Sequence, residues 1–151
     1  MWLPGNQSIN TFTGFLKPDP EITLTIPSAT DKAISVGAYD TSTDKVASFS
    51  GRGFTRENNQ IKPDIVAPGV NIRSAATGGG TTVLSGTSMA TPFVTGSAAL
   101  MMEWGIVRGN DPYLYGEKIK AYLIRGAKHL PGYEQWPNKQ AGWGALCLRD
   151  S

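Results

Sequence analysis

The alternation of apolar and polar positions predicts that short strands fill the first part of this chain. Ile22 to Ile26 alternates apolar with polar residues and stops at Pro27, which is typical of a half-buried strand. Ala33 to Ala38 is a short run rich in apolar residues and predicts a second, more deeply buried strand. Further short strands are predicted next to turns rich in Pro and Gly, at residues 64–67, 70–72 and 81–84.

After residue 86 the spacing becomes helical. From Thr87 to Trp104 apolar residues recur every three or four positions, small or apolar residues fill the other faces, and Glu103 is the only charge. This pattern predicts a helix that is buried on every side. Residues 117–127 predict a second, amphipathic helix at a surface. Strands that alternate with helices favour an α/β layer fold with a mostly parallel sheet.

Length and charge narrow the class of protein. The 151 residues suffice for the core of one domain. Residues 1–21 are polar and broken by Pro and Gly, so we expect a connector there and the domain over 22–151. The formal net charge is only +2, which argues against a nucleic-acid partner. The most apolar window, 97–107, is shorter than the ~20 residues of a membrane-spanning helix, so no membrane segment is predicted.

The candidate chemistry lies at Ser88, within the run Ser-Gly-Thr-Ser-Met-Ala-Thr-Pro. Ser88 falls in the first turn of the predicted helix, where unpaired backbone N–H groups and the helix dipole stabilise an anion. If Ser88 attacked a carbonyl group, its own N–H would help to hold the oxyanion, and Gly86 would leave room for substrate. Pro92 breaks the rule against prolines inside helices, which is more common at functional sites. Thr87 and Ser88 could instead do nothing more than cap the helix.

Residues Gly86 to Pro92 resemble the nucleophile motif of the subtilisin-like serine peptidases, the subtilases. Residues 33–38, 47–50 and 62–70 resemble successive core segments of that family in the same order. The resemblance implies a partial subtilisin-like fold, with Ser88 as the nucleophile that cleaves a polypeptide substrate through an acyl-enzyme. The chain also resembles the subgroup that includes the spore-germination subtilases, and this likeness implies a secreted or spore-associated protein.

Serine needs a base to take its proton, normally a histidine oriented by a carboxylate. The family order is Asp, His, Ser, yet the only histidine of this chain, His129, follows Ser88. We therefore expect the nucleophile-bearing C-terminal part of a peptidase domain, inactive alone, whose partner is the N-terminal part of that domain. The alternative is a catalytically silent binding or structural module on the same scaffold, that is, a pseudoprotease.

Other candidate residues carry weaker signals. His129 lies in a segment with the composition of a surface loop, so we expect no catalytic role. Asp64 resembles one ligand of a weak cation site in some subtilisins, but Lys62 stands where a second carboxylate would be expected, so no metal is predicted. Phe93 stands where many family members carry a structural histidine. The glycines at 78–80 lack the Gly-Lys-Ser/Thr of a phosphate-binding loop, and no cofactor is implied.

Overall fold

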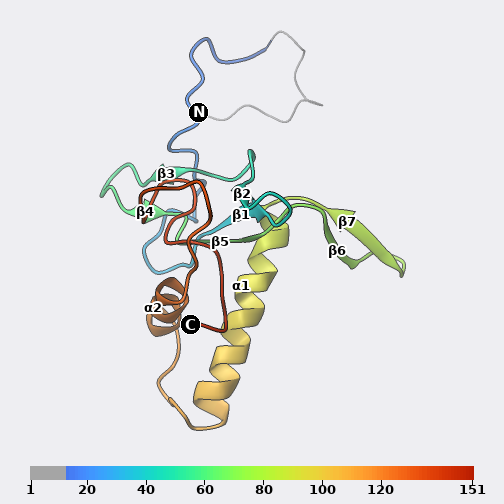
Figure 1. The fold of residues 1–151 in the computed structure, drawn as a ribbon, viewed down its shortest axis with the longest axis vertical. Coiled ribbons are helices and arrows are strands. Elements are labelled where there is room, and N and C mark those ends of the chain that lie inside the picture. Colours follow the sequence, from blue (N-terminus) through green and yellow to red (C-terminus); the bar gives the residue numbers. More distant parts are fainter. Residues whose placement is uncertain (1–12) are drawn as a thin grey trace.

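The computed structural model describes residues 13–151, and Figure 1 shows their arrangement. The strands are β1 (Val36–Asp40), β2 (Lys45–Val46), β3 (Gly53–Phe54), β4 (Ile61–Lys62), β5 (Ile65–Pro68), β6 (Ile72–Ala75) and β7 (Thr81–Leu84). The helices are α1 (Thr87–Met102), which continues into the π-helical turn η1 (Glu103–Val107), and α2 (Glu117–Arg125). The α/β class predicted from the sequence is confirmed.

Strands β1 and β5 form the centre of the fold. They are parallel, with Val36 opposite Ile65 and Ala38 opposite Ala67. Strand β2 joins the end of β1 in antiparallel orientation, so the sheet order is β2-β1-β5. Beyond β5, Ala145 forms a parallel bridge to Val66. Among the described residues, the pairs β3–β4 and β6–β7 are antiparallel hairpins, so parallel pairing is confined to the central sheet.

The strand predicted at Ile22 to Ile26 is wrong. Residues 13–35 form neither helix nor strand, Ile22 has a φ of 53°, and Ile26 is 92% exposed. The Thr23 N–H donates to the carbonyl of Arg52 at 2.7 Å, and the Thr23 hydroxyl accepts the Arg52 N–H at 2.9 Å. These bonds hold the segment beside Arg52, directly before β3, without a strand ladder. Of the predicted connector, residues 1–12 lie outside the described residues, and its boundary at residue 22 stays a prediction.

Helix α1 packs on β1 and β5 along one stripe only. Its buried residues are Ala90, Val94, Ser97 and Met101. Large apolar side chains on its other faces and on η1 are exposed, including Phe93, Leu100, Met102 and Trp104. The expected burial on every side is therefore not found, because the elements within residues 13–151 cover one face of the helix.

Helix α2 is amphipathic, as its spacing predicts. Ile119 and Leu123 are buried, and Lys118 is exposed. The helix ends at Arg125, two residues earlier than expected, where Gly126 follows. No helix in the described part of the chain has the length and apolar character needed to span a membrane.

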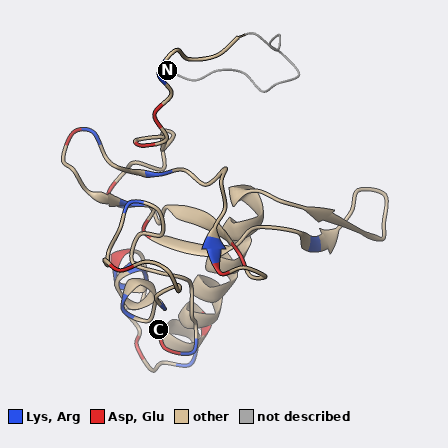
Figure 2. Cartoon of the chain, turned by 45° about the horizontal axis from the view of Figure 1, so that its top comes forward, with Lys and Arg blue, Asp and Glu red and all other residues tan. Residues whose placement is uncertain are grey.

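The β6–β7 hairpin projects away from the rest of the structure (Figure 1). It carries one charged residue, Arg73, and Figure 2 shows the arm almost free of blue and red. The glycines at 78–80 form its tip with φ values of 83°, 102° and 75°, a region that favours glycine. Val83 and Leu84 are 47% and 52% exposed, so the base of the arm leaves apolar surface uncovered just before α1.

Candidate active site

The turn that precedes Ser88 is fixed to the end of β5. The carbonyl of Gly69 accepts the Gly86 N–H at 2.8 Å, and the Ser85 hydroxyl accepts the Asn71 N–H at 2.9 Å. A Cβ atom on Gly69 would lie 2.5 Å from that of Ala38, so only glycine allows this close approach. The central sheet thereby determines where α1 begins and where the exposed Ser88 lies.

The first turn of α1 has the backbone donors expected of an anion-binding position. The first bond of the α-helical type runs from the Ala90 N–H to the Gly86 carbonyl at 3.3 Å, so the N–H groups of Thr87 and Ser88 have no helical acceptor. Within the described residues no side chain caps this turn, and none of its own residues is acidic. The structure therefore gives no support to a role of Thr87 and Ser88 as mere caps.

Ser88 lines a groove of about 440 Å³. The start of α1 lines it together with the beginning of β1 and the irregular segment around Thr25 and Ser28. The described residues that line the groove include no Asp, Glu, His, Lys or Arg. Ser88 is thus placed on an accessible groove that lacks, in this part of the chain, a side chain able to take its proton.

His129 lies elsewhere and is exposed, as its loop composition predicts. Its ring stacks on the indole of Trp136, with centroids 4.4 Å apart and planes 1° apart. Tyr133 meets the same indole edge-on at 5.8 Å. His129 is absent from the groove lining. No sequence pattern indicates this stacking, because the two rings come from separate turns of the C-terminal segment.

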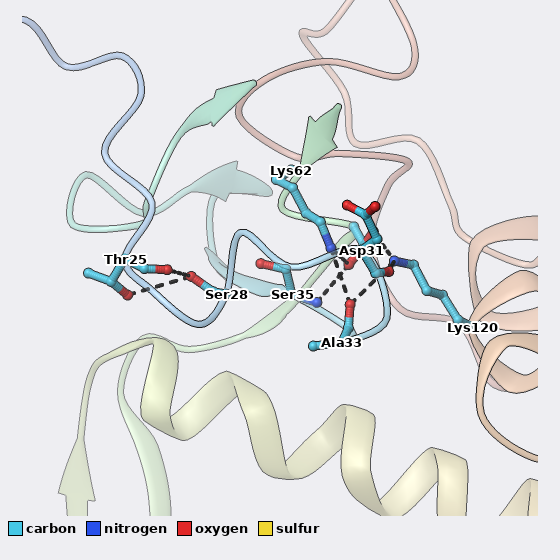
Figure 3. A network of polar contacts seen from close by, with 8 residues as sticks. Thr25, Ser28, Asp31, Ala33, Ser35, Lys62 and Lys120 are labelled. Carbon is cyan, nitrogen blue, oxygen red and sulfur yellow. Dashed lines mark hydrogen bonds and ion pairs between the residues drawn. The ribbon is translucent and has the colours of Figure 1, made fainter. Parts of the chain in front are cut away.

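Asp64 is at the centre of a buried ion cluster, whose two lysines, Lys62 and Lys120, are labelled in Figure 3. One carboxylate oxygen, Oδ2, lies 2.7 Å from Lys62 Nζ, and the other, Oδ1, lies 2.9 Å from Lys120 Nζ. Oδ2 also accepts the Ser35 N–H at 2.7 Å. Burial, and more weakly the charge of Lys120, holds the pKa of Lys62 below its ordinary value, although Asp64 opposes this shift. Both oxygens of the candidate metal ligand are therefore occupied by ammonium groups.

Lys62 could be singled out from the sequence, but the part played by Lys120 could not. Lys120 comes from α2, and the amphipathic pattern of that helix places it among ordinary surface lysines. Only the docking of α2 against the segment before β1 brings it to Asp64, and its side chain is 16% exposed there. No short-range pattern could have indicated this contact.

A serine at the start of a helix, fixed to the end of a parallel strand and facing a groove, is an arrangement that suits a serine hydrolase. The model of the Subtilase family matches residues 4–144, and the chain belongs to that family of serine peptidases. The narrower likeness to the spore-germination subgroup stays a prediction.

Individual relatives agree with this membership. The chain is 37% identical to the serine protease AprX of Bacillus subtilis (strain 168), over 89% of its own length. It is 50% identical to the Clostridium perfringens CspB protease, with a TM-score of 0.87 over 91% of the chain. The prenylagaramide maturation protease PagA is 34% identical, with a TM-score of 0.71 over 87% of the chain. The chain spans 32% of AprX, 30% of the CspB protease and 46% of PagA.

Proposed function

We propose that this chain is the nucleophile-bearing part of a serine endopeptidase and that Ser88 is its nucleophile. The observation that carries the proposal is that Ser88 is exposed on the groove, in a helical turn whose first N–H groups have no hydrogen-bond acceptor within the helix. The family match and the relatives named as proteases support the same activity.

In this proposal Ser88 Oγ attacks the carbonyl carbon of a peptide bond while a base takes the hydroxyl proton. The carbonyl oxygen becomes an oxyanion, which the backbone N–H of Ser88 helps to stabilise. The amine leaves with a proton from the base, and water then hydrolyses the acyl-enzyme. Gly86 suits the approach of substrate, because the nearest atom to a Cβ placed on it would be the Met89 sulfur at 3.5 Å.

The base is proposed to come from a second polypeptide segment, the N-terminal part of the peptidase domain. Two observations support this requirement: no histidine precedes Ser88, and the described groove residues include no titratable base. By itself the chain is then expected to retain only the weak catalysis that binding and oxyanion stabilisation provide.

Turnover of an unfolded protein substrate tests the proposal. The chain would be assayed alone and after mixing with the part of the CspB protease that precedes the region matching this chain, which is chosen because of the 50% identity. Turnover is expected only in the mixture, and Ser88→Ala in this chain should abolish it.

Serine-dependent turnover by the chain alone would contradict the need for an outside base. A mixture that forms a complex but shows no turnover would favour the alternative, a pseudoprotease that uses the subtilase scaffold for binding. The same mixture with Ser88→Ala separates cleavage by this serine from contaminating proteases.

A further inference from the structure

The segment that leads into β1 is held by side chains from two distant elements. Lys62 Nζ, from β4, donates to the Ala33 carbonyl at 3.1 Å. Lys120 Nζ, from α2, donates to the Asp31 carbonyl at 2.8 Å and to the Ala33 carbonyl at 3.3 Å. Figure 3 shows the two ammonium groups converging on this segment.

Asp64 completes this attachment through Ser35. Its carboxylate accepts the Ser35 N–H at 2.7 Å, and its own N–H donates to the Ser35 carbonyl at 2.8 Å. Backbone atoms of three alternate residues, Asp31, Ala33 and Ser35, are therefore fixed by one carboxylate and two ammonium groups. The overlapping stretch from Ile34 to Gly37, which includes Ser35, lines the groove that Ser88 also lines.

The cluster contains two ammonium groups and one carboxylate, and Lys62 is the more deeply buried of the two lysines. Two ammonium groups share one carboxylate, and the Lys62 side chain is only 1% exposed. Without Lys62, Asp64 would still be paired with Lys120, so Lys62 is not needed to neutralise the carboxylate. A buried charge that its partner does not need costs desolvation free energy. Beyond Asp64, Lys62 Nζ contacts the carbonyl of Ala33, the residue before Ile34, which lines the groove.

We propose that Lys62 is a positioning residue whose ammonium group holds the Ala33–Ser35 segment in place, so that the part of the groove lined by Ile34 to Gly37 keeps its shape beside Ser88. The ammonium acts as a built-in cation between a carbonyl and a carboxylate oxygen. Lys62 itself does not touch the substrate groove. The positioning of this part of the groove concerns this chain alone, whereas its consequence for catalysis rests on the proposed function of Ser88.

Hydrogen exchange of the 151-residue chain with Lys62→Ala tests the proposal directly. Loss of one hydrogen bond to a charged group predicts that the Ser35 amide exchanges about tenfold faster. The amide of Val94, in the buried stripe of α1, should keep its wild-type rate. The matched control is Lys118→Ala, which removes an exposed lysine of α2 that pairs with Asp111 at 2.5 Å and leaves the cluster intact.

Chemical rescue separates charge from volume. Lys62→Ala removes three methylene groups and the ammonium, which n-propylammonium replaces, whereas n-propanol has similar size and no charge. The amine should restore slow exchange at Ser35, and the alcohol should not. If Lys62→Ala fails to fold, Lys62→Met keeps most of the apolar stem and serves for the exchange measurement.

Equal acceleration at Ser35 and Val94, unchanged exchange at Ser35, equal rescue by the alcohol, or unfolding of both variants would each overturn the positioning role. A second readout uses the complemented protein. Lys62→Ala should slow the reaction of Ser88 with a fluorophosphonate about tenfold, while the affinity for the added peptidase part stays unchanged. If Ser88 of the wild-type complex never reacts, the proposed function is contradicted. Hydrogen exchange at Ser35 tests the positioning role of Lys62 independently of that outcome.

Discussion

The carbonyl of Gly69 accepts the N–H of Gly86 at 2.8 Å, and this bond joins the end of β5 to the turn that presents Ser88. A methyl group on Gly69 would lie 2.5 Å from the Cβ of Ala38 and 3.0 Å from the Gly86 carbonyl oxygen. Gly69→Ala must therefore push α1 away from the sheet. We expect a loss of about 1–3 kcal/mol in the free energy of unfolding, as for other overpacked cores, measured by urea denaturation.

Gly96→Ala is the matched control for this substitution. Gly96 lies inside α1, and a Cβ placed there would have no atom within 4 Å. Alanine should stabilise the helix at this position by about 0.5–1 kcal/mol. Equal effects of the two substitutions would show that the contact between Gly69 and Gly86 does not constrain the start of α1.

The buried Lys62 predicts a pH dependence of stability. Burial lowers its pKa from the ordinary 10.5, and Lys120 lowers it further against the opposing effect of Asp64. Between the lowered folded-state pKa and 10.5, the unfolded chain binds more protons at this site than the folded chain does. The contribution of Lys62 to the free energy of unfolding therefore rises as the pH increases through that window.

Comparison with Lys62→Met isolates this contribution. From neutral pH to pH 10.5, urea denaturation should show wild type gaining stability relative to the variant. The Asp64–Lys120 pair is present in both proteins, so the variant keeps a paired Asp64. A difference that stays constant with pH, or that falls, would contradict the lowered pKa of Lys62.

His129→Ala should affect stability slightly and leave Ser88 unaffected. The loop position alone predicts a change within about 0.5 kcal/mol. The stacking on Trp136 raises the expected loss to about 0.5–1.5 kcal/mol, the usual range for aromatic pairs. Thermal unfolding followed by tryptophan fluorescence measures this loss. A fall in the reactivity of Ser88 without a loss of stability would give His129 a role that its position does not explain.

The uncovered faces of α1 and η1 predict self-association of the chain. Leu100 and Trp104 are 56% and 53% exposed, and burial of one large apolar side chain contributes about 1.5–3 kcal/mol. Sedimentation velocity should show species larger than a monomer at micromolar concentrations. Leu100→Gln should reduce them, whereas Thr95→Gln, at an exposed polar position of α1, should not. A stable monomer would indicate that this surface needs no partner.

The elements with strong periodicity could be predicted from the sequence. The helical spacing after residue 86 predicted α1. Its continuation as the π-helical turn η1 was not predicted, because apolar spacing does not distinguish the two helix types. Strand β7 occupies the residues predicted for it, whereas β1 lies two to three residues later than expected. The alternation at 22–26 was misleading, because no neighbouring strand in the described residues pairs with that segment.

The candidate site could also be predicted only in part from the sequence. Ser88 could be identified because its chemistry is contained in one continuous motif at a helix start. The Lys62–Asp64–Lys120 cluster could not, because it depends on how α2 docks against the segment before β1. The two-residue strands β2, β3 and β4 were also missed, since their length is below any recognisable alternation.

Covalent labelling of Ser88 tests the central claim most directly. The chain would be treated with a fluorophosphonate, alone and in complex with the preceding part of the CspB protease, and the modified residue located by mass spectrometry. We predict an adduct on Ser88 only in the complex, and none when the histidine of the added part that we propose as the base is replaced by alanine. Labelling of the isolated chain at the same rate, or a stable complex in which Ser88 stays unmodified, would contradict the account.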